Sequence, residues 1–195
     1  MALSVEMNLI AQQMDVVTAF LNGEVEEEIY MTVPEKLELI LNLIIKKKTN
    51  QSTTKVAKKW LENLQGGNRK ACKLRKAIYE LRQSRRQWYL KADGELRKLG
   101  LTSSKSDPCL YVLKDERSTI FLTVHVDDII MSTNNLEIMK SIKNDVVKLF
   151  IMKDMGQIDY CLGIKFKQDL KNGTITMSQK EIYPRNIGPF GNGES

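Results

Sequence analysis

Histidine and cysteine are scarce in this sequence. His125 is the single histidine among 195 residues, and the cysteines, Cys72, Cys109 and Cys161, lie far apart. One histidine argues against a Ser/His or Cys/His nucleophile and against a histidine-built zinc site, and the cysteine spacing matches no paired metal-ligand motif. We therefore expect three free thiols in a reducing compartment.

The sequence also lacks a long uncharged apolar run. Residues 1–10 have neither the basic start nor the apolar stretch of a signal peptide, and no stretch is long enough to cross a membrane. We expect an intracellular, cytoplasmic protein with no membrane partner. With 42% hydrophobic residues, the 195-residue chain is long enough to bury one sizeable core, which predicts one main domain.

The sequence does contain a pair of adjacent aspartates inside one of its most apolar stretches. Asp127 and Asp128 separate residues 120–126 from residues 129–131, which predicts two strands meeting at a tight hairpin. The acidic pair has two interpretations. Aspartate is a favoured turn residue that needs no metal, whereas carboxylates beside a core are also ligands for a hard divalent cation that carries substrate phosphates.

A third aspartate favours the metal interpretation. Asp15 stands in another apolar stretch, residues 12–21. Only a long-range strand pairing could bring Asp15 beside the hairpin of Asp127 and Asp128. Three carboxylates converging from two strands would form the clamp that a two-metal nucleotidyl-transfer site uses to hold attacking and leaving oxygens in line.

The residues around these aspartates form blocks that resemble the reverse transcriptase of copia-type retrotransposons. In chain order the blocks are Gln13–Gly23 with Glu28–Met31, Lys73–Gln83 with Arg86–Trp88, Ser106–Tyr111, Val124–Asp128, Met155–Ile158 and Leu162–Ile164. They follow the family's order and cover about residues 3–181. The resemblance implies an α+β fold: a polymerase palm, in which an antiparallel sheet has helices packed on one face, with partial fingers.

The resemblance also implies a role for each matching position. Asp15, Asp127 and Asp128 would be catalytic and would hold two Mg²⁺ ions, with Mn²⁺ as the alternative. Ala19 and Phe20 would lie beneath the incoming nucleotide, where Phe20 favours deoxynucleotides by shape. The other implied positions are Arg82 and Gln83 near the nucleotide or template, and Arg85, Arg86, Leu162 and Gly163 on the nucleic acid. Core packing of Phe20, and a solvated helix start at Arg82 and Gln83, are the competing interpretations.

Positive charge is concentrated in one part of the sequence. The chain is +6 overall, but residues 69–98 hold 11 basic and 3 acidic side chains, a local +8 that leaves −2 for the rest. A helix is predicted here, with a core-facing stripe of Leu81, Trp88, Ala92, Leu96 and Leu99. A basic helical face can bind phosphate backbones without reading sequence, and a solvated cationic face is the alternative. The implied partners are an RNA or DNA template with primer, and deoxynucleoside triphosphates.

The expected organisation is a reverse transcriptase region over residues 1–181, with a helical insertion at about 35–70. Within the insertion we expect one or two helices, around residues 37–45 and 56–61, with a solvated loop over residues 46–54. Residues 182–195 are expected to be a divergent tail, disordered or frameshifted. The thumb, ribonuclease H and integrase regions have no counterpart, which predicts a truncated copy.

The predicted function is RNA-directed DNA synthesis, with two-metal nucleotidyl transfer onto a primer 3′ hydroxyl. The alternative is a catalytically inactive nucleic-acid-binding relic of a transposable element. Three departures from the family pattern bear on this choice. Glu80 stands where the family usually has Gly, His125 where it usually has Tyr, and Arg85 where it often has Pro. The sequence leaves the oligomeric state open.

Overall fold

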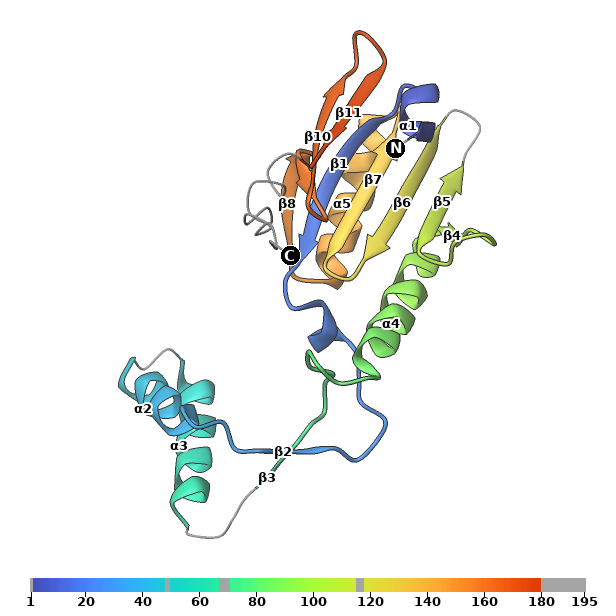
Figure 1. Cartoon of the computed structure of the whole chain (residues 1–195). Coiled ribbons are helices and arrows are strands. Elements are labelled where there is room, and N and C mark those ends of the chain that lie inside the picture. Colours follow the sequence, from blue (N-terminus) through green and yellow to red (C-terminus); the bar gives the residue numbers. More distant parts are fainter. Residues whose placement is uncertain (1, 48–49, 67–70, 115–117, 180–195) are drawn as a thin grey trace, which may run out of the picture.

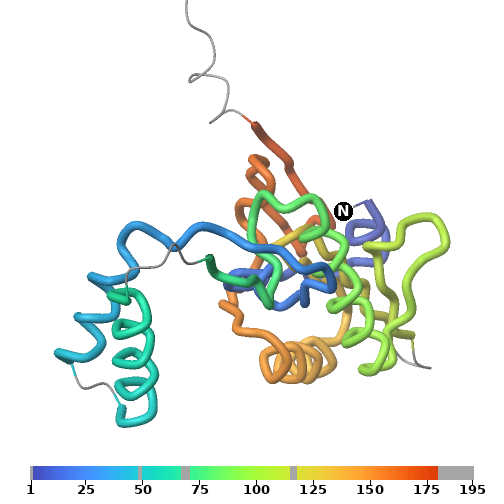
Figure 2. The backbone as a smooth tube through the Cα atoms, turned by 90° about the horizontal axis from the view of Figure 1, so that it is seen from below, coloured from blue at the N-terminus to red at the C-terminus, as the bar shows by residue number. Residues whose placement is uncertain are grey.

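The computed structural model describes residues 2–47, 50–66, 71–114 and 118–179. The tail predicted over residues 182–195 lies outside these ranges. Figure 1 shows a sheet flanked by helices and, apart from it, a helical hairpin joined to it by a thin two-stranded ladder. The same separation appears from below in Figure 2. No helix in the described ranges is long and apolar enough to cross a membrane.

The main sheet has six strands in the order β4-β5-β6-β7-β1-β8, and every neighbouring pair is antiparallel. The strands are β1 (Ile10–Val16), β4 (Thr102–Ser103), β5 (Leu110–Lys114), β6 (Thr119–His125), β7 (Asp128–Thr133) and β8 (Met152–Gln157). Strand β1 is the first in the chain, yet it lies between β7 and β8. The sheet therefore depends on pairing between distant segments.

Two helices, α4 (Ser84–Lys98) and α5 (Leu136–Leu149), cover one face of this sheet. The main core lies between them and the strands, and its largest buried side chains include Met14, Trp88, Leu96, Tyr111, Leu122, Met131 and Met139. Lys143 of α5 is buried against the sheet, where it donates to Gln12 of β1 and to Asp154 of β8 (2.7 Å). The α+β arrangement, with helices packed on one face of an antiparallel sheet, is as predicted.

The opposite face of the sheet carries short elements. Helix α1 (Ala2–Glu6) contacts it through Ser4, whose hydroxyl donates to Ser132 Oγ (3.2 Å). A three-stranded sheet, ordered β11-β10-β9, also lies there and is formed by β9 (Tyr160–Cys161), β10 (Ile164–Asp169) and β11 (Thr174–Ser178). A second apolar cluster seals the contact, comprising Ala11, Ile158, Cys161 and Phe166 with Ile130, Ile164 and Ile175 beside it.

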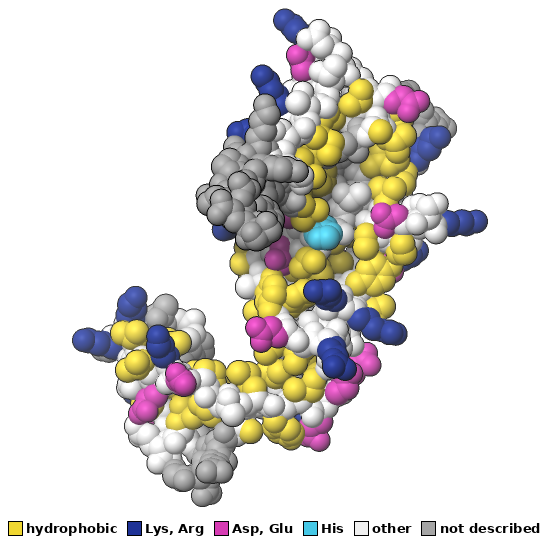
Figure 3. Space-filling model, in the orientation of Figure 1, with side chains coloured by type: hydrophobic (Ala, Val, Ile, Leu, Met, Phe, Trp, Pro, Cys, Tyr) yellow, Lys and Arg dark blue, Asp and Glu magenta, His cyan; other side chains and the backbone are white. Residues whose placement is uncertain are grey.

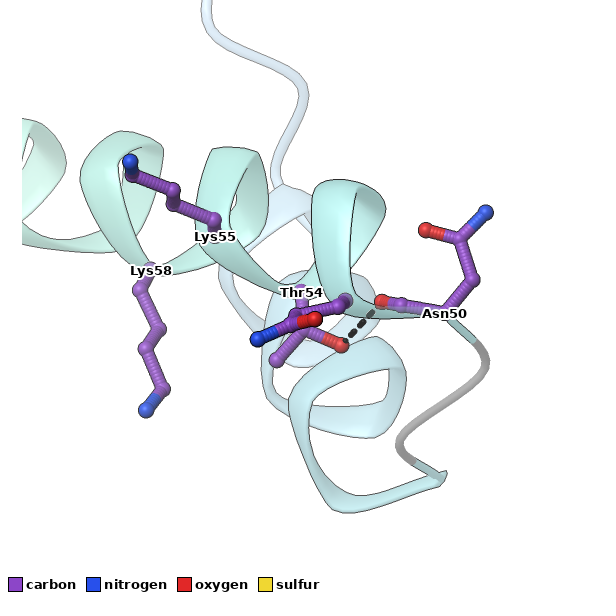
Figure 4. Close-up of a pocket in the computed structure, with 5 residues that line it drawn as sticks. Asn50, Thr54, Lys55 and Lys58 are labelled. Carbon is purple, nitrogen blue, oxygen red and sulfur yellow. Dashed lines mark hydrogen bonds between the residues drawn. The ribbon is translucent and has the colours of Figure 1, made fainter.

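The predicted insertion is a helical hairpin of α2 (Leu37–Lys47) and α3 (Gln51–Gln65). The predicted loop over 46–54 is too long, because α3 already begins at Gln51. Asn50 caps this helix: its side-chain oxygen accepts from the Thr53 amide, and its carbonyl accepts from the Thr54 hydroxyl (2.8 Å; Figure 4). The hairpin joins the sheet through β2 (Tyr30–Thr32) and β3 (Ala71–Lys73), which form a two-stranded ladder.

The entry to α4 is the other departure from the sequence prediction. Trp88, Ala92 and Leu96 are buried as predicted, but the helix begins only at Ser84, so Leu81 of the predicted stripe precedes it. Helix α4 packs closely against a short 3₁₀ turn from a much earlier part of the chain, η1 (Ala19–Asn22). A Cβ at Gly23 would stand 2.9 Å from Gln87 Cβ, so this contact requires glycine.

The packing of the core predicts a strong contrast between two leucine substitutions. Leu122 has no exposed surface, and Leu122→Ala should lower the free energy of unfolding by about 2 to 5 kcal/mol, because it removes packed methyl groups and leaves a cavity. Leu90 on α4 is 47% exposed, and Leu90→Ala should change the free energy of unfolding little. Urea unfolding followed by circular dichroism measures both; equal losses would contradict the assignment of the core.

Candidate active site

The antiparallel pairing of β1 with β7 places Asp15 directly opposite Asp128. The backbone amide of Val16 also donates to the carbonyl oxygen of Asp127 (2.7 Å), which extends the pairing into the hairpin turn. Because side chains alternate along a strand, Asp15 and Asp128 lie on the face away from α4 and α5. The predicted long-range pairing of Asp15 with the hairpin is confirmed.

The hairpin turn between β6 and β7 consists of Val126 and Asp127, since His125 pairs with Asp128. Val126 has a φ of 53°, a left-handed conformation that is strained for a β-branched residue. The indole of Trp88, buried in the core as predicted, donates from Nε1 to the Val126 carbonyl oxygen (2.8 Å). Helix α4 therefore holds the backbone of the acidic turn in place.

The carboxylate of Asp127 is bound by Tyr79. The phenol hydroxyl lies 2.8 Å from each of the two Asp127 oxygens. Burial, followed by the hydrogen bond and negative charge of Asp127, raises the pKa of Tyr79 to about 12. The Tyr79 ring also packs on Phe20, with ring centroids 4.4 Å apart. Tyr79 thus covers Asp127 and lies over the position predicted for the incoming nucleotide.

The carboxylate of Asp128 lies beside residues of two different sheets. The Gln13 side-chain amide on β1 donates to Asp128 Oδ1 (2.7 Å), and the Cys161 thiol on β9 lies near the Asp128 charge. Burial raises the pKa of the Cys161 thiol to about 11, and the neighbouring negative charge of Asp128 acts in the same direction. Gln13 is 7% exposed and Cys161 is 3% exposed. Both contacts come from the buried side of the site.

The sequence did not predict the roles of Tyr79, Gln13 and Cys161. A signal was present for Gln13, because it stands two residues before Asp15 and strand alternation places both on one face. No comparable signal exists for Tyr79 and Cys161. Tyr79 belongs to a segment without regular structure, and Cys161 reaches the site through the packing of a second sheet.

The carboxylate oxygens of Asp15, Asp127 and Asp128 are the type of ligand that Mg²⁺ prefers. The predicted convergence on one point is nevertheless not seen. Within the described ranges, no group of three or more His, Cys, Asp or Glu side chains is arranged so that it could hold a metal ion. In this arrangement Asp127 accepts from the Tyr79 hydroxyl at the turn, and Asp128 accepts from the Gln13 amide of β1.

Beside the acidic turn lies an open hollow of about 760 Å³, lined by Phe20, Tyr79, Glu80, Leu81, Arg82, Arg85 and Val126. Of the predicted nucleotide-contacting residues, Phe20 and Arg82 therefore line one space. Phe20 is also part of the core, so its two interpretations are compatible. Figure 3 shows this face, with the single histidine near its centre and basic side chains gathered where the chain enters α4.

The remaining predicted nucleotide- and nucleic-acid-binding residues do not line this hollow. Ala19 is buried beneath Phe20 in the main core, and Arg86 is exposed on the first turn of α4. Gln83 turns away, and its amide donates to Glu27 (3.4 Å). Leu162 and Gly163, the implied contacts to the nucleic acid, both have positive φ (51° and 78°) and form the turn between β9 and β10.

Glu80, which lies in the wall of the hollow, has a φ of 77°. This is a backbone conformation that glycine adopts freely and that L side chains rarely adopt. Glu80 stands where the family that this sequence resembles usually has glycine. The geometry supplies a physical reason for that glycine.

Comparison with known proteins gives a consistent result. Residues 49–191 match the protein family described as Reverse transcriptase (RNA-dependent DNA polymerase). The Retrovirus-related Pol polyprotein from transposon TNT 1-94 of Nicotiana tabacum is 31% identical over 97% of this chain and 12% of its own length. The corresponding polyprotein from transposon RE1 of Arabidopsis thaliana is 31% identical over 80% of this chain and 9% of its own length.

A putative transposon Ty5-1 protein of Saccharomyces cerevisiae is 28% identical over 88% of this chain and 47% of its own length. The chain thus spans less than half of each of these three relatives. No solved structure matches. The family match covers most of the sequence, and the similarity to the tobacco polyprotein also includes the segment around Asp15. The chain therefore belongs to the reverse transcriptase (RNA-dependent DNA polymerase) family, in the branch found in copia-type retrotransposons.

Proposed function

We propose that this chain carries the polymerase site of a copia-type reverse transcriptase, which adds deoxynucleotides to a primer 3′ hydroxyl on an RNA or DNA template. One observation supports this above all others: Asp15 and Asp128 face each other across β1 and β7, with Asp127 at the adjoining turn. Three carboxylates in this order, within a family named for the reaction, fit two-metal nucleotidyl transfer.

In this proposal the six-stranded sheet with α4 and α5 is the palm, and the β2–β3 ladder with the α2–α3 hairpin belongs to the fingers. Residues 1–181 would then be one reverse transcriptase region. Asp15, Asp127 and Asp128 would hold Mg²⁺ or Mn²⁺. The bound ions would supply charge stabilisation to the phosphate oxygens of the nucleotide.

The residues of the hollow suit a deoxynucleoside triphosphate. Arg82 and Arg85 place two guanidinium groups at its wall, where they would attract the phosphates. Phe20, fixed by core packing, would form a rigid floor that excludes a 2′ hydroxyl by shape. The single Tyr79 hydroxyl lies 2.8 Å from both Asp127 oxygens, and the remaining lone pairs of that carboxylate would stay available to a cation.

One prediction of this proposal concerns the carboxylates. Asp127→Asn and Asp128→Asn should each abolish Mg²⁺-dependent primer extension on an RNA template, because each removes a negative oxygen from the donor set. Asp145→Asn, on the far helix α5, is the matched control and should retain the wild-type rate. Unfolding curves would show that all variants fold. Extension that persisted in both hairpin variants would refute the proposed site.

Another prediction concerns the strained backbone at Glu80. Glu80→Gly should raise the free energy of unfolding by about 1 kcal/mol, because glycine adopts the positive φ without a Cβ penalty. Glu80→Ala removes the same charge but keeps the Cβ, so it should give no such gain. Urea unfolding distinguishes the two. If alanine stabilised the chain as much as glycine, the carboxylate would be the cause and the strain argument would be wrong.

A nucleic-acid-binding chain that does not polymerise is the second candidate. The arrangement of the acidic side chains favours it, because no group of three or more His, Cys, Asp or Glu in the described part of the chain is placed to hold a metal ion. The basic entry to α4 would be retained in such a chain, with Arg82, Arg85 and Arg86 all exposed. Both candidates require this basic surface, whereas only the first requires the aspartates.

Replacing Arg82, Arg85 and Arg86 together with alanine should weaken binding to a primer–template duplex and make it less salt-dependent, because fewer counterions are released. Lys140 and Lys148 on α5 provide a control pair away from this surface. Fluorescence anisotropy across a salt series measures the effect. Equal losses in both sets would indicate that binding follows net charge alone. Full binding by Asp127→Asn, with a wild-type chain that never extends primers, would favour the second candidate.

A further inference from the structure

The carboxylate of Asp128 is restrained from outside its own hairpin. The Gln13 amide donates to it from β1, and the Cys161 thiol of β9 lies near its charge. The two residues are far apart in sequence and belong to different sheets, and both are buried. Asp128 itself is only partly buried. Its carboxylate is therefore held from the protein interior.

The contact of Gln13 with Asp128 is specific in its chemistry. An ionised carboxylate has only acceptors, so it must be the NH₂ group of Gln13 that faces Asp128 Oδ1 at 2.7 Å. A hydrogen bond to a charged acceptor is stronger than a neutral one. A buried amide is also costly to leave unpaired, so the amide and the carboxylate constrain each other. The bond fixes one oxygen of Asp128 and with it the direction of the other.

The neighbouring glutamine provides a comparison within the same strand. Gln12 points to the opposite face of β1, where its oxygen accepts from Lys143 of α5. That contact joins the sheet to a helix and touches none of the three aspartates. Gln12 and Gln13 therefore have the same chemistry and the same strand, but only Gln13 acts on the site.

We propose that Gln13 is a positioning residue for Asp128: its side-chain amide fixes the carboxylate in the orientation from which it binds a divalent cation. The inference rests on the proposed function, because it assigns Asp128 a metal. Groups that orient a metal ligand typically change metal affinity by about 10 to 100-fold when they are removed. Gln13 would act in this way through Oδ1, without touching the ion or the substrate.

The test measures cation binding directly, without catalysis. Mn²⁺ binding to the full chain is followed by electron paramagnetic resonance for the wild type, Gln13→Met, Gln12→Met and Asp128→Asn. Gln13→Met keeps the length of the side chain but removes the donor, and we expect about tenfold weaker Mn²⁺ binding. Gln12→Met should lower the stability to urea but leave the dissociation constant unchanged.

A second variant makes the result independent of folding defects. Gln13→Asn keeps a polar amide but is one methylene shorter, so it should weaken Mn²⁺ binding in the same way if Gln13→Met fails to fold. Mn²⁺ binding of wild-type strength in a folded Gln13 variant would overturn the positioning role, whatever primer extension shows. Wild-type binding that depends on Asp128 and Gln13, in a chain that extends no primers, would support the positioning role while the polymerase proposal fails. Absence of Asp128-dependent binding in the wild type would overturn both.

Discussion

The antiparallel pairing of β1 with β7 is the constraint on which the rest of the structure depends. It inserts the first strand of the chain into the middle of the sheet, next to a hairpin more than a hundred residues later. One face of β1 then contributes Met14 and Val16 to the core beneath α4 and α5, and the other carries Asp15. Because a register shift by one residue would exchange these faces, core packing also fixes the position of the carboxylate.

The sequence predicted the features that depend on local pattern and on few contacts. The hairpin at Asp127, the pairing of Asp15 and the burial of Trp88 follow from apolar patterning around single residues. The partners of the carboxylates could not be predicted in the same way, because Tyr79 and Cys161 reach them through tertiary packing. The turn at Leu162 could not be predicted either, since leucine carries no signal for a positive φ.

Backbone strain is distributed unevenly in this chain. In the described ranges five residues other than glycine have positive φ, and four of them, Thr18, Glu80, Val126 and Leu162, lie in the loops that surround the site. Such conformations persist only where the surrounding structure enforces them. Here the buried indole of Trp88 and the pairing of the flanking strands provide that enforcement for Val126. The packed sheet and helix α4 therefore hold the Val126 turn in its strained conformation.

The β2–β3 ladder has a consequence for how this chain can change in length. Tyr30 pairs with Lys73 and Thr32 pairs with Ala71, so the intervening segment leaves and re-enters the fold at a single place. The cost of closing that segment is met by the ladder, and closure entropy rises only slowly with the number of residues enclosed. The α2–α3 hairpin can therefore lengthen, shorten or be exchanged while the sheet and its carboxylates keep their places. The segment between β2 and β3 is therefore a site where insertions and replacements can be accepted during evolution.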